Sequence, residues 1–206
     1  MSACNLFSTI LPLTASAPDG AADNNVNDEL LKLFSKLAKD ETPMVRREAA
    51  VTYGEVSKSA LSVLNFDEVL GFDNDGEIFT GVVPDVLLPI LLNLANDDQD
   101  SVRLTTSTNC VSLISALLSS RSRGAISQGG VSEMSDENKS DMSLCSKFIT
   151  STIIPLLVSS CEDRSWRVRW TIASNFGDVV DSLKLIGMVS ERAKRASFVT
   201  WPHPQT

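Results

Sequence analysis

The stretch Asp40-Glu-Thr-Pro-Met-Val45-Arg46 occurs in two further versions along this chain, Asp97-Asp-Gln-Asp-Ser-Val102-Arg103 and Asp163-Arg-Ser-Trp-Arg-Val168-Arg169. In each version an Asp is followed five residues later by Val and six residues later by Arg, and a helical pattern of apolar residues comes next. Pro89 and Pro155 each stand eight residues before the Asp of their copy. Three copies in register within 206 residues indicate an internal repeat, so a stacked helical array is the first fold to consider.

Each copy has the pattern of two helices joined by a turn. The Asp at the end of the first helix can accept hydrogen bonds from the free N–H groups that open the second helix. The Val is expected to face the seam between helices, and the Arg to reach an Asp in its own or the neighbouring turn. A stack of such repeats would carry a ladder of Asp–Arg pairs that sets the register, while the apolar seams supply the stability.

We therefore expect an all-α solenoid of about three helix pairs plus a partial N-terminal repeat. The expected helices of the three pairs are Asp28 to Lys39 and Met44 to about Leu61, Asp85 to Asn96 and Ser101 to Leu118, and Leu144 to Cys161 and Arg167 to about Leu185. Gly54 lies inside one of these helices, where it costs about 1 kcal/mol relative to Ala. A close helix crossing would explain why Gly stands there.

The expected organisation of the chain follows from these helices and from the turn-forming residues between them. Residues 1–14 form the second helix of a partial repeat, a linker runs from Ala15 to Asn27, and residues 28–64, 82–119 and 144–185 form the HEAT-type repeats. Two insertions lie between repeats, one around 71–81 and a Ser- and Gly-rich one over 120–143 that is expected to be disordered. Residues 186–206 form a tail that departs from the repeat pattern, as in a fragment of a longer array or a truncated or divergent product.

Composition and charge exclude several classes of function. The net charge is −8, which argues against nucleic acid or an anionic membrane as the main partner, since both call for excess Lys and Arg. The most apolar run, residues 82–95, is interrupted by Pro84, Asp85 and Pro89 and is shorter than the roughly 20 residues of a membrane span. The four cysteines show no CxxC pairing, which favours free thiols in a reducing compartment, the cytoplasm or the nucleus.

No motif of catalysis or metal binding stands out. Asp73-Asn-Asp-Gly-Glu alternates oxygen ligands but lacks the spacing and terminal Glu of a calcium loop, so a solvated acidic insertion is the better interpretation. His203 is the sole histidine and has no base or nucleophile near it in sequence. We expect a protein without catalytic residues, metal or cofactor.

Three stretches resemble successive repeats of one known family. Asp40-Glu-Thr-Pro-Met-Val-Arg-Arg-Glu-Ala-Ala, Asp97-Asp-Gln-Asp-Ser-Val-Arg-Leu and Ser165-Trp-Arg-Val-Arg-Trp are similar, in this order, to HEAT repeats of the scaffold (A) regulatory subunits of protein phosphatase 2A. Ser2-Ala-Cys-Asn-Leu-Phe-Ser is similar to the second helix of the repeat before them. The resemblance covers Ser2 to about Leu185, apart from the linker and the insertions.

The resemblance implies an all-helical horseshoe with no active site. In that family the turns within the early and middle repeats form a ridge that binds a regulatory B-type subunit, and the last repeats hold the catalytic subunit. The repeats of this chain look like middle ones, so it would bind the catalytic subunit only if C-terminal repeats were supplied. The contact positions that the resemblance implies are Glu41, Pro43, Arg46, Arg47, Asp98, Gln99, Asp100, Ser165, Trp166 and Arg167.

Alternative interpretations stay open for several of these residues. Arg46 and its counterparts suit the ladder better than an interface, and Pro43 can simply shape its turn and start a helix. Trp166 is either a partner contact, since Trp and Arg are common binding hot spots, or a packing residue on the neighbouring turn. A second function is also open, that of a transport or adaptor protein holding a cargo segment on its concave face. Acidic and aromatic residues along the second helices would favour it, but Ala, Thr, Ser and Val predominate there and favour packing.

Overall fold

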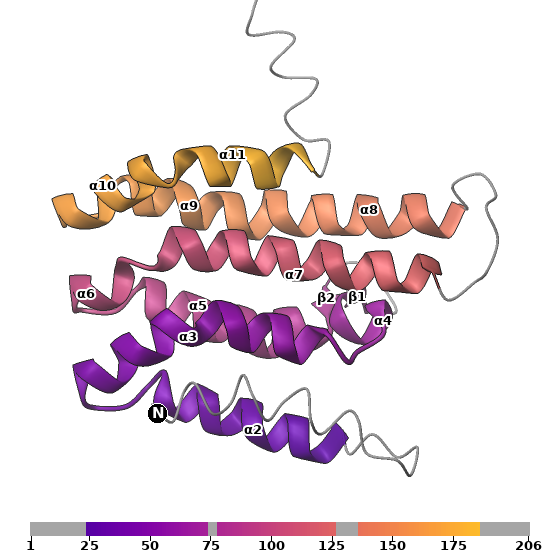
Figure 1. Ribbon diagram of the computed structural model, residues 1–206, viewed down its shortest axis with the longest axis horizontal. Coiled ribbons are helices and arrows are strands. Elements are labelled where there is room, and N and C mark those ends of the chain that lie inside the picture. Colours follow the sequence, from indigo (N-terminus) through magenta and orange to yellow (C-terminus); the bar gives the residue numbers. More distant parts are fainter. Residues whose placement is uncertain (1–23, 74–77, 127–135, 186–206) are drawn as a thin grey trace, which may run out of the picture.

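Three helix pairs follow one another along the chain, and each pair lies beside the previous one (Figure 1). This computed structural model describes residues 24–73, 78–126 and 136–185. The predicted helix at 1–14 and the predicted tail at 186–206 lie outside the described residues. Within the described part the architecture is the predicted all-α solenoid, and its only strands form a short hairpin between the first and second pairs.

The first pair consists of α2 (Asn24–Leu37) and α3 (Pro43–Leu61). The helix α2 begins before the expected Asp28, so the end of the predicted linker is helical. Pro43 occupies the first position of α3, where its missing N–H needs no partner. Leu31 and Phe34 of α2 are buried and belong to the core cluster that the helix pairs share.

The first helices of the second and third pairs contain a widened turn just before the proline. The second pair has η1 (Val83–Leu87) followed by α5 (Leu88–Ala95), and the third has α8 (Asp136–Phe148), η2 (Ile149–Ile153) and α9 (Ile154–Cys161). The N–H of Leu88 donates to Val83 O and that of Ile154 to Ile149 O, five residues back in each case. Because a proline inside a helix lacks an N–H and clashes with the preceding turn, a π-type turn accommodates it. Pro89 and Pro155 are the residues that recur eight positions before the turn Asp.

The second helices of these pairs are each divided in two, whereas the sequence predicted continuous helices. The second pair has α6 (Asp100–Arg103) and α7 (Thr106–Ile126), and the third has α10 (Trp166–Ser174) and α11 (Phe176–Lys184). At the first break the Thr106 hydroxyl donates to Arg103 O, at 2.8 Å. At the second break Asn175 Nδ2 donates to Ser107 Oγ of the previous pair, at 3.1 Å. Short polar side chains compete with the helical backbone in this way.

The predicted disorder over 120–143 is wrong for most of that segment. The helix α7 continues to Ile126 and α8 begins at Asp136, and only residues 127–135 between them lie outside the described part. A bias toward Ser and Gly therefore obscured the ends of two long helices.

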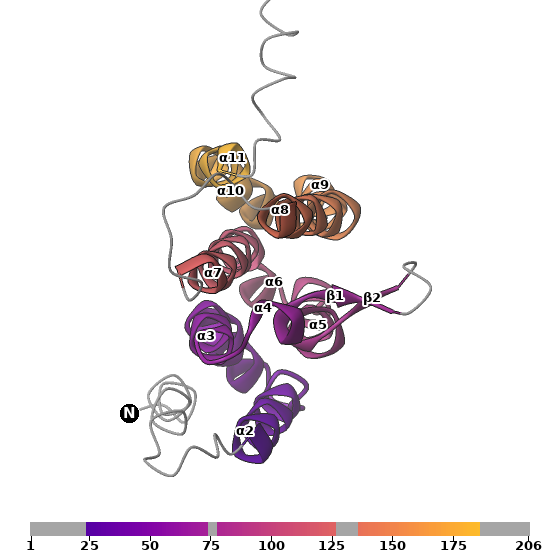
Figure 2. The same ribbon diagram turned by 90° about the vertical axis from the view of Figure 1, so that its right-hand side faces the viewer.

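The insertion around 71–81 forms a structured connector. After the short helix α4 (Phe66–Val69), strands β1 (Gly71–Phe72) and β2 (Phe79–Thr80) pair antiparallel. Phe79 stacks on Phe72 at a centroid distance of 4.9 Å and meets Phe148 of α8 edge-on at 5.2 Å. Lys147 Nζ lies 4.5 Å from the centre of the Phe72 ring. The hairpin thus links the second pair to the first helix of the third (Figure 2).

Gly54 marks the closest helix crossing in the described core. It lies in α3, which packs along α7, and a Cβ at this position would stand 2.7 Å from Ser112 Oγ and 3.0 Å from Ser112 Cβ. Both distances are too short for real contacts, so only Gly fits. The predicted reason for Gly54 is confirmed.

The helical segment Asp141–Cys161 is long and apolar enough to cross a membrane by those two criteria alone. It was not predicted from the sequence, in which residues 82–95 stand out as the most apolar run. In the structure the segment packs against α7 and α10, and Cys145, Phe148, Ile149 and Ile153 are buried. These contacts are those of a core helix of a solenoid.

The cysteines of the described residues are free, as predicted. Cys110 and Cys145 are buried and Cys161 is exposed. Burial raises the pKa of the Cys110 thiol to about 12 and that of the Cys145 thiol to about 11. These two thiols therefore stay protonated and act as small core residues.

Candidate interaction ridge

The turns within the three pairs lie together along one edge of the solenoid (Figure 1). In each turn the Asp carboxylate accepts a hydrogen bond from the N–H two residues further on. The distances are 2.8 Å from Thr42 to Asp40, 2.9 Å from Gln99 to Asp97 and 2.7 Å from Ser165 to Asp163. The donor is the residue just before the second helix, so the Asp fixes the turn and thereby aims the helix that follows.

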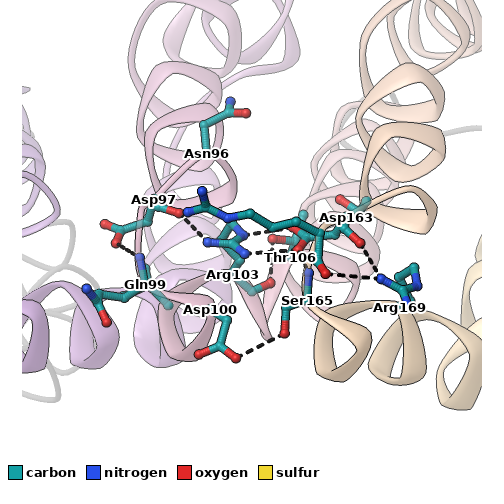
Figure 3. Close-up of polar contacts among 12 residues, drawn as sticks. Asn96, Asp97, Gln99, Asp100, Arg103, Thr106, Asp163, Ser165 and Arg169 are labelled. Carbon is teal, nitrogen blue, oxygen red and sulfur yellow. Dashed lines mark hydrogen bonds and ion pairs between the residues drawn. The ribbon is translucent and has the colours of Figure 1, made fainter.

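A ladder of Arg–Asp pairs joins successive turns, as the sequence predicted. Arg46 binds the Asp97 carboxylate through Nε and Nη2, the latter at 3.1 Å. Arg103 binds Asp163 in the same two-pronged way, at 2.7 and 2.9 Å (Figure 3). In both cases Nη1 donates to backbone carbonyls of the residue's own turn. Each Arg therefore ties its own turn to the next one.

The ladder is held in its ionised form. Hydrogen bonds from Arg103 lower the pKa of Asp163, helped by the Ser165 N–H and opposed by burial. Burial would raise the pKa of Asp97, but the hydrogen bonds from Arg46 and from the Gln99 N–H outweigh it, and the net shift is downward. The Arg103 side chain is only 5% exposed. These four side chains satisfy one another, so they offer little charge to a partner.

The third rung lacks its acid. Arg169 Nη1 donates to Asp163 O at 2.6 Å and to Arg164 O at 3.3 Å. Among the described residues no carboxylate forms an ion pair with Arg169, and its side chain is exposed.

The second and third turns are also joined by more exposed contacts. Ser165 Oγ lies 3.0 Å from Asp100 Oδ2, and Arg167 Nη1 lies 3.6 Å from the same oxygen. Arg164 Nη2 donates to Asp98 O at 2.8 Å and lies 4.0 Å from the Asp98 carboxylate. A polar groove runs beside these contacts, and its lining includes the exposed Glu162.

The ten implied contact residues differ in what they can offer a partner. Arg46 serves the ladder, which supports the first of its two interpretations. Asp100 and Ser165 are half-buried between turns, and the others are exposed: Glu41, Pro43, Arg47, Asp98, Gln99, Trp166 and Arg167. Trp166 is 67% exposed, so most of its ring is not used for packing on the neighbouring turn. The assignment of these residues to an interface stays a prediction.

One feature of the ridge was missed in the sequence. Trp170 lies one helical turn after Trp166 on α10 and is 64% exposed. The spacing of four residues between two Trp in a helix was the available signal. Elsewhere in the described residues, no three His, Cys, Asp or Glu side chains come together as a metal site would need.

Comparisons with known proteins agree with this architecture. A family model described as HEAT repeat matches residues 153–183, which lie in the third helix pair. A probable serine/threonine-protein phosphatase PP2A regulatory subunit of Caenorhabditis elegans is 36% identical over 105 residues, 51% of this chain and 13% of that protein. The A-type regulatory subunit of protein phosphatase PP2A from Schizosaccharomyces pombe is 30% identical over 162 residues, 79% of this chain and 20% of the relative. Its namesake in Saccharomyces cerevisiae is 25% identical over 179 residues, 87% of this chain and 21% of the relative.

The chain spans only 13% to 21% of the length of these relatives. The aligned part covers most of this chain in the two fungal comparisons, including the segments that carry the three turns. The resemblance inferred from those turns is therefore confirmed.

Proposed function

The chain is a HEAT-repeat protein whose relatives are regulatory subunits of protein phosphatase 2A, and on this premise we propose that it is a non-catalytic scaffold in a phosphatase complex of that type. It binds a B-type regulatory subunit through the ridge of turns, in the cytoplasm or the nucleus. The catalytic subunit joins only where further C-terminal repeats are supplied. Holding two subunits on one frame raises their effective concentration for each other, which is how a scaffold without chemistry contributes.

The exposed indole of Trp166 is the observation that carries this proposal. It stands at the start of α10, on a turn whose position is fixed by the Asp163 hydrogen bonds and by Ser165 and Arg167 on Asp100. A large aromatic side chain held on a rigid turn loses little conformational entropy when a partner covers it. Aromatic residues beside Arg are typical of residues that dominate binding energy.

The adaptor alternative receives no support from the second helices. Ala49, Ala50 and Val56 of α3 are buried, as are Leu113 and Leu117 of α7. These side chains pack into the core and leave little of the helices for a cargo segment.

The test is the affinity of the chain for a purified B-type regulatory subunit, with Trp166→Ala compared with wild type. We expect Trp166→Ala to weaken binding at least roughly tenfold, a typical hot-spot effect. Trp170→Ala is the matched control, because it removes an equally exposed Trp from the same helix, and it should change affinity less than Trp166→Ala does. Equal binding by wild type and Trp166→Ala would remove Trp166 from the interface. No binding by wild type would contradict the proposed function.

A further inference from the structure

The two ends of the described solenoid present opposite halves of one ladder rung. At the C-terminal end Arg169 has its guanidinium exposed and no carboxylate partner among the described residues. At the N-terminal end the Asp40 carboxylate accepts the Thr42 N–H, and no Arg of the described residues pairs with it. Between these ends every Arg of the ladder binds the Asp of the next turn.

The contacts between the second and third turns show what one turn requires of the next. Arg103 binds Asp163, Asp98 faces Arg164, and Asp100 faces Ser165 and Arg167. Counted from the turn Asp, these contacts join position six to position zero, position one to position one, and position three to positions two and four.

The same pairing rule can be applied to the third turn of one chain followed by the first turn of another. Position six is then Arg169 and faces Asp40, and position one is Arg164 and faces Glu41. Both pairs join opposite charges. Position three is Trp166, which faces Thr42 and Met44. Met44 is 65% exposed, and a thioether packs well against an aromatic ring.

An apolar residue at the C-terminal end fits the same interpretation. Phe176 stands thirteen residues after Asp163, where the earlier repeats have Tyr53 and Cys110. Both of those side chains are fully buried, and Tyr53 O–H donates to Leu87 O of the following pair, at 2.9 Å. Phe176 is 59% exposed. The third repeat therefore exposes a position that the other two cover.

We propose that copies of this chain associate head to tail, with Arg169 of one chain bound to Asp40 of the next. Residues 186–206 contain no Asp and a single Glu, so they hold no further turn of the Asp…Val-Arg kind to complete the rung. The contact joins two different surfaces, so it forms an open series of copies rather than a closed pair. Because two charged pairs contribute, association weakens as salt is added.

Sedimentation of the full chain over a range of concentrations tests this directly. Wild type should show a mass that rises with concentration beyond the dimer and falls in high salt. Arg169→Glu alone and Asp40→Asn alone should each weaken association at least roughly tenfold. The amide oxygen that Asp40→Asn introduces can still accept the Thr42 N–H, so the turn is kept.

Mixing the two variants provides the decisive arm. The Asp40→Asn chain keeps Arg169, and the Arg169→Glu chain keeps Asp40, so an equal mixture should form one-to-one dimers and nothing larger. Dimer formation would also show that both variants are folded. Asp67→Asn, which removes a carboxylate from α4 at the opposite end of the helices, is the control and should associate as wild type does.

Three results would overturn the proposal. Wild type could remain monomeric at every concentration. The two variants could associate as strongly as wild type. The mixture could stay monomeric while circular dichroism shows both variants folded.

Discussion

Asp97 and Asp163 are charged residues that the fold holds ionised, and this makes stability depend on pH. Their pKa values are lowered in the folded chain, whereas an unfolded Asp titrates near about 3.9. A carboxylate with a lowered folded pKa stabilises the protein fully above its unfolded pKa, and this contribution is lost as the pH falls through the folded value. We expect the free energy of unfolding to fall steeply below about pH 4.

The variant Asp163→Asn isolates one rung of this effect. Asn keeps an oxygen for the Ser165 N–H but has no charge for Arg103. We expect it to be less stable than wild type at neutral pH and to lose less stability on acidification, as measured by urea unfolding from pH 7 downward. If both proteins lose the same amount between neutral and acid pH, the rung does not contribute in the way that its geometry indicates.

Gly54 permits a second prediction about a single residue. Gly54→Ala gains about 1 kcal/mol of helix propensity but creates an overlap with Ser112 that costs about 1–3 kcal/mol. We expect a net loss of stability in chemical denaturation. In the Ser112→Gly background the overlap is gone, so the same Gly54→Ala change should stabilise. The same sign in both backgrounds would refute the close-crossing explanation.

Single residues also show what the sequence could reveal. The spacing from Asp to Arg predicted the ladder because a guanidinium six residues after the turn can reach a carboxylate one repeat away. The exposure of Trp166 could not be predicted, because the same residue at the same place could have packed on its neighbour. The choice between those two outcomes depends on the shape of the adjoining turn.

At the scale of elements, the hairpin β1–β2 connects the second and third pairs. Phe79→Ala removes its stack on Phe72 and its edge contact with Phe148. We expect a loss of about 1–3 kcal/mol in the free energy of unfolding, since Phe79 is half-buried. Ile78→Ala is the matched control, because the neighbouring Ile78 is 65% exposed and should change stability by less than about 0.5 kcal/mol. Similar losses for both variants would mean that the hairpin does not hold the pairs together.

Element boundaries were predicted well where local chemistry determines them and poorly elsewhere. The turn Asp and Pro43 define the start of α3 to within one residue of the expected Met44. The division of α6 from α7 and of α10 from α11 depends on tertiary contacts such as Asn175 with Ser107, which lie 68 residues apart. The helices inside 120–143 were missed because Ser-rich composition hides the buried Cys145 side of α8.

For the whole molecule, the ladder couples repeats that would otherwise unfold separately. The stability of a solenoid is approximately the sum of its repeats and of the interfaces between them. All three Trp residues lie in or after the third repeat, so Trp fluorescence reports on the C-terminal part of the chain, whereas circular dichroism reports on every helix. In wild type we expect the two signals to change together during urea unfolding.

Arg103→Met should separate the two signals. It leaves the Asp163 carboxylate, whose side chain is 11% exposed, without its two-pronged partner, and breaking a buried pair costs about 3–5 kcal/mol. The cost is felt at the interface of the second and third repeats, so the fluorescence transition should move to lower urea than the dichroism transition. Arg169→Met is the control, since it changes the same position of the next turn, where no carboxylate is bound, and its two transitions should stay together. Superimposable transitions in Arg103→Met would show that the apolar seams alone couple the repeats and that the ladder only sets their register.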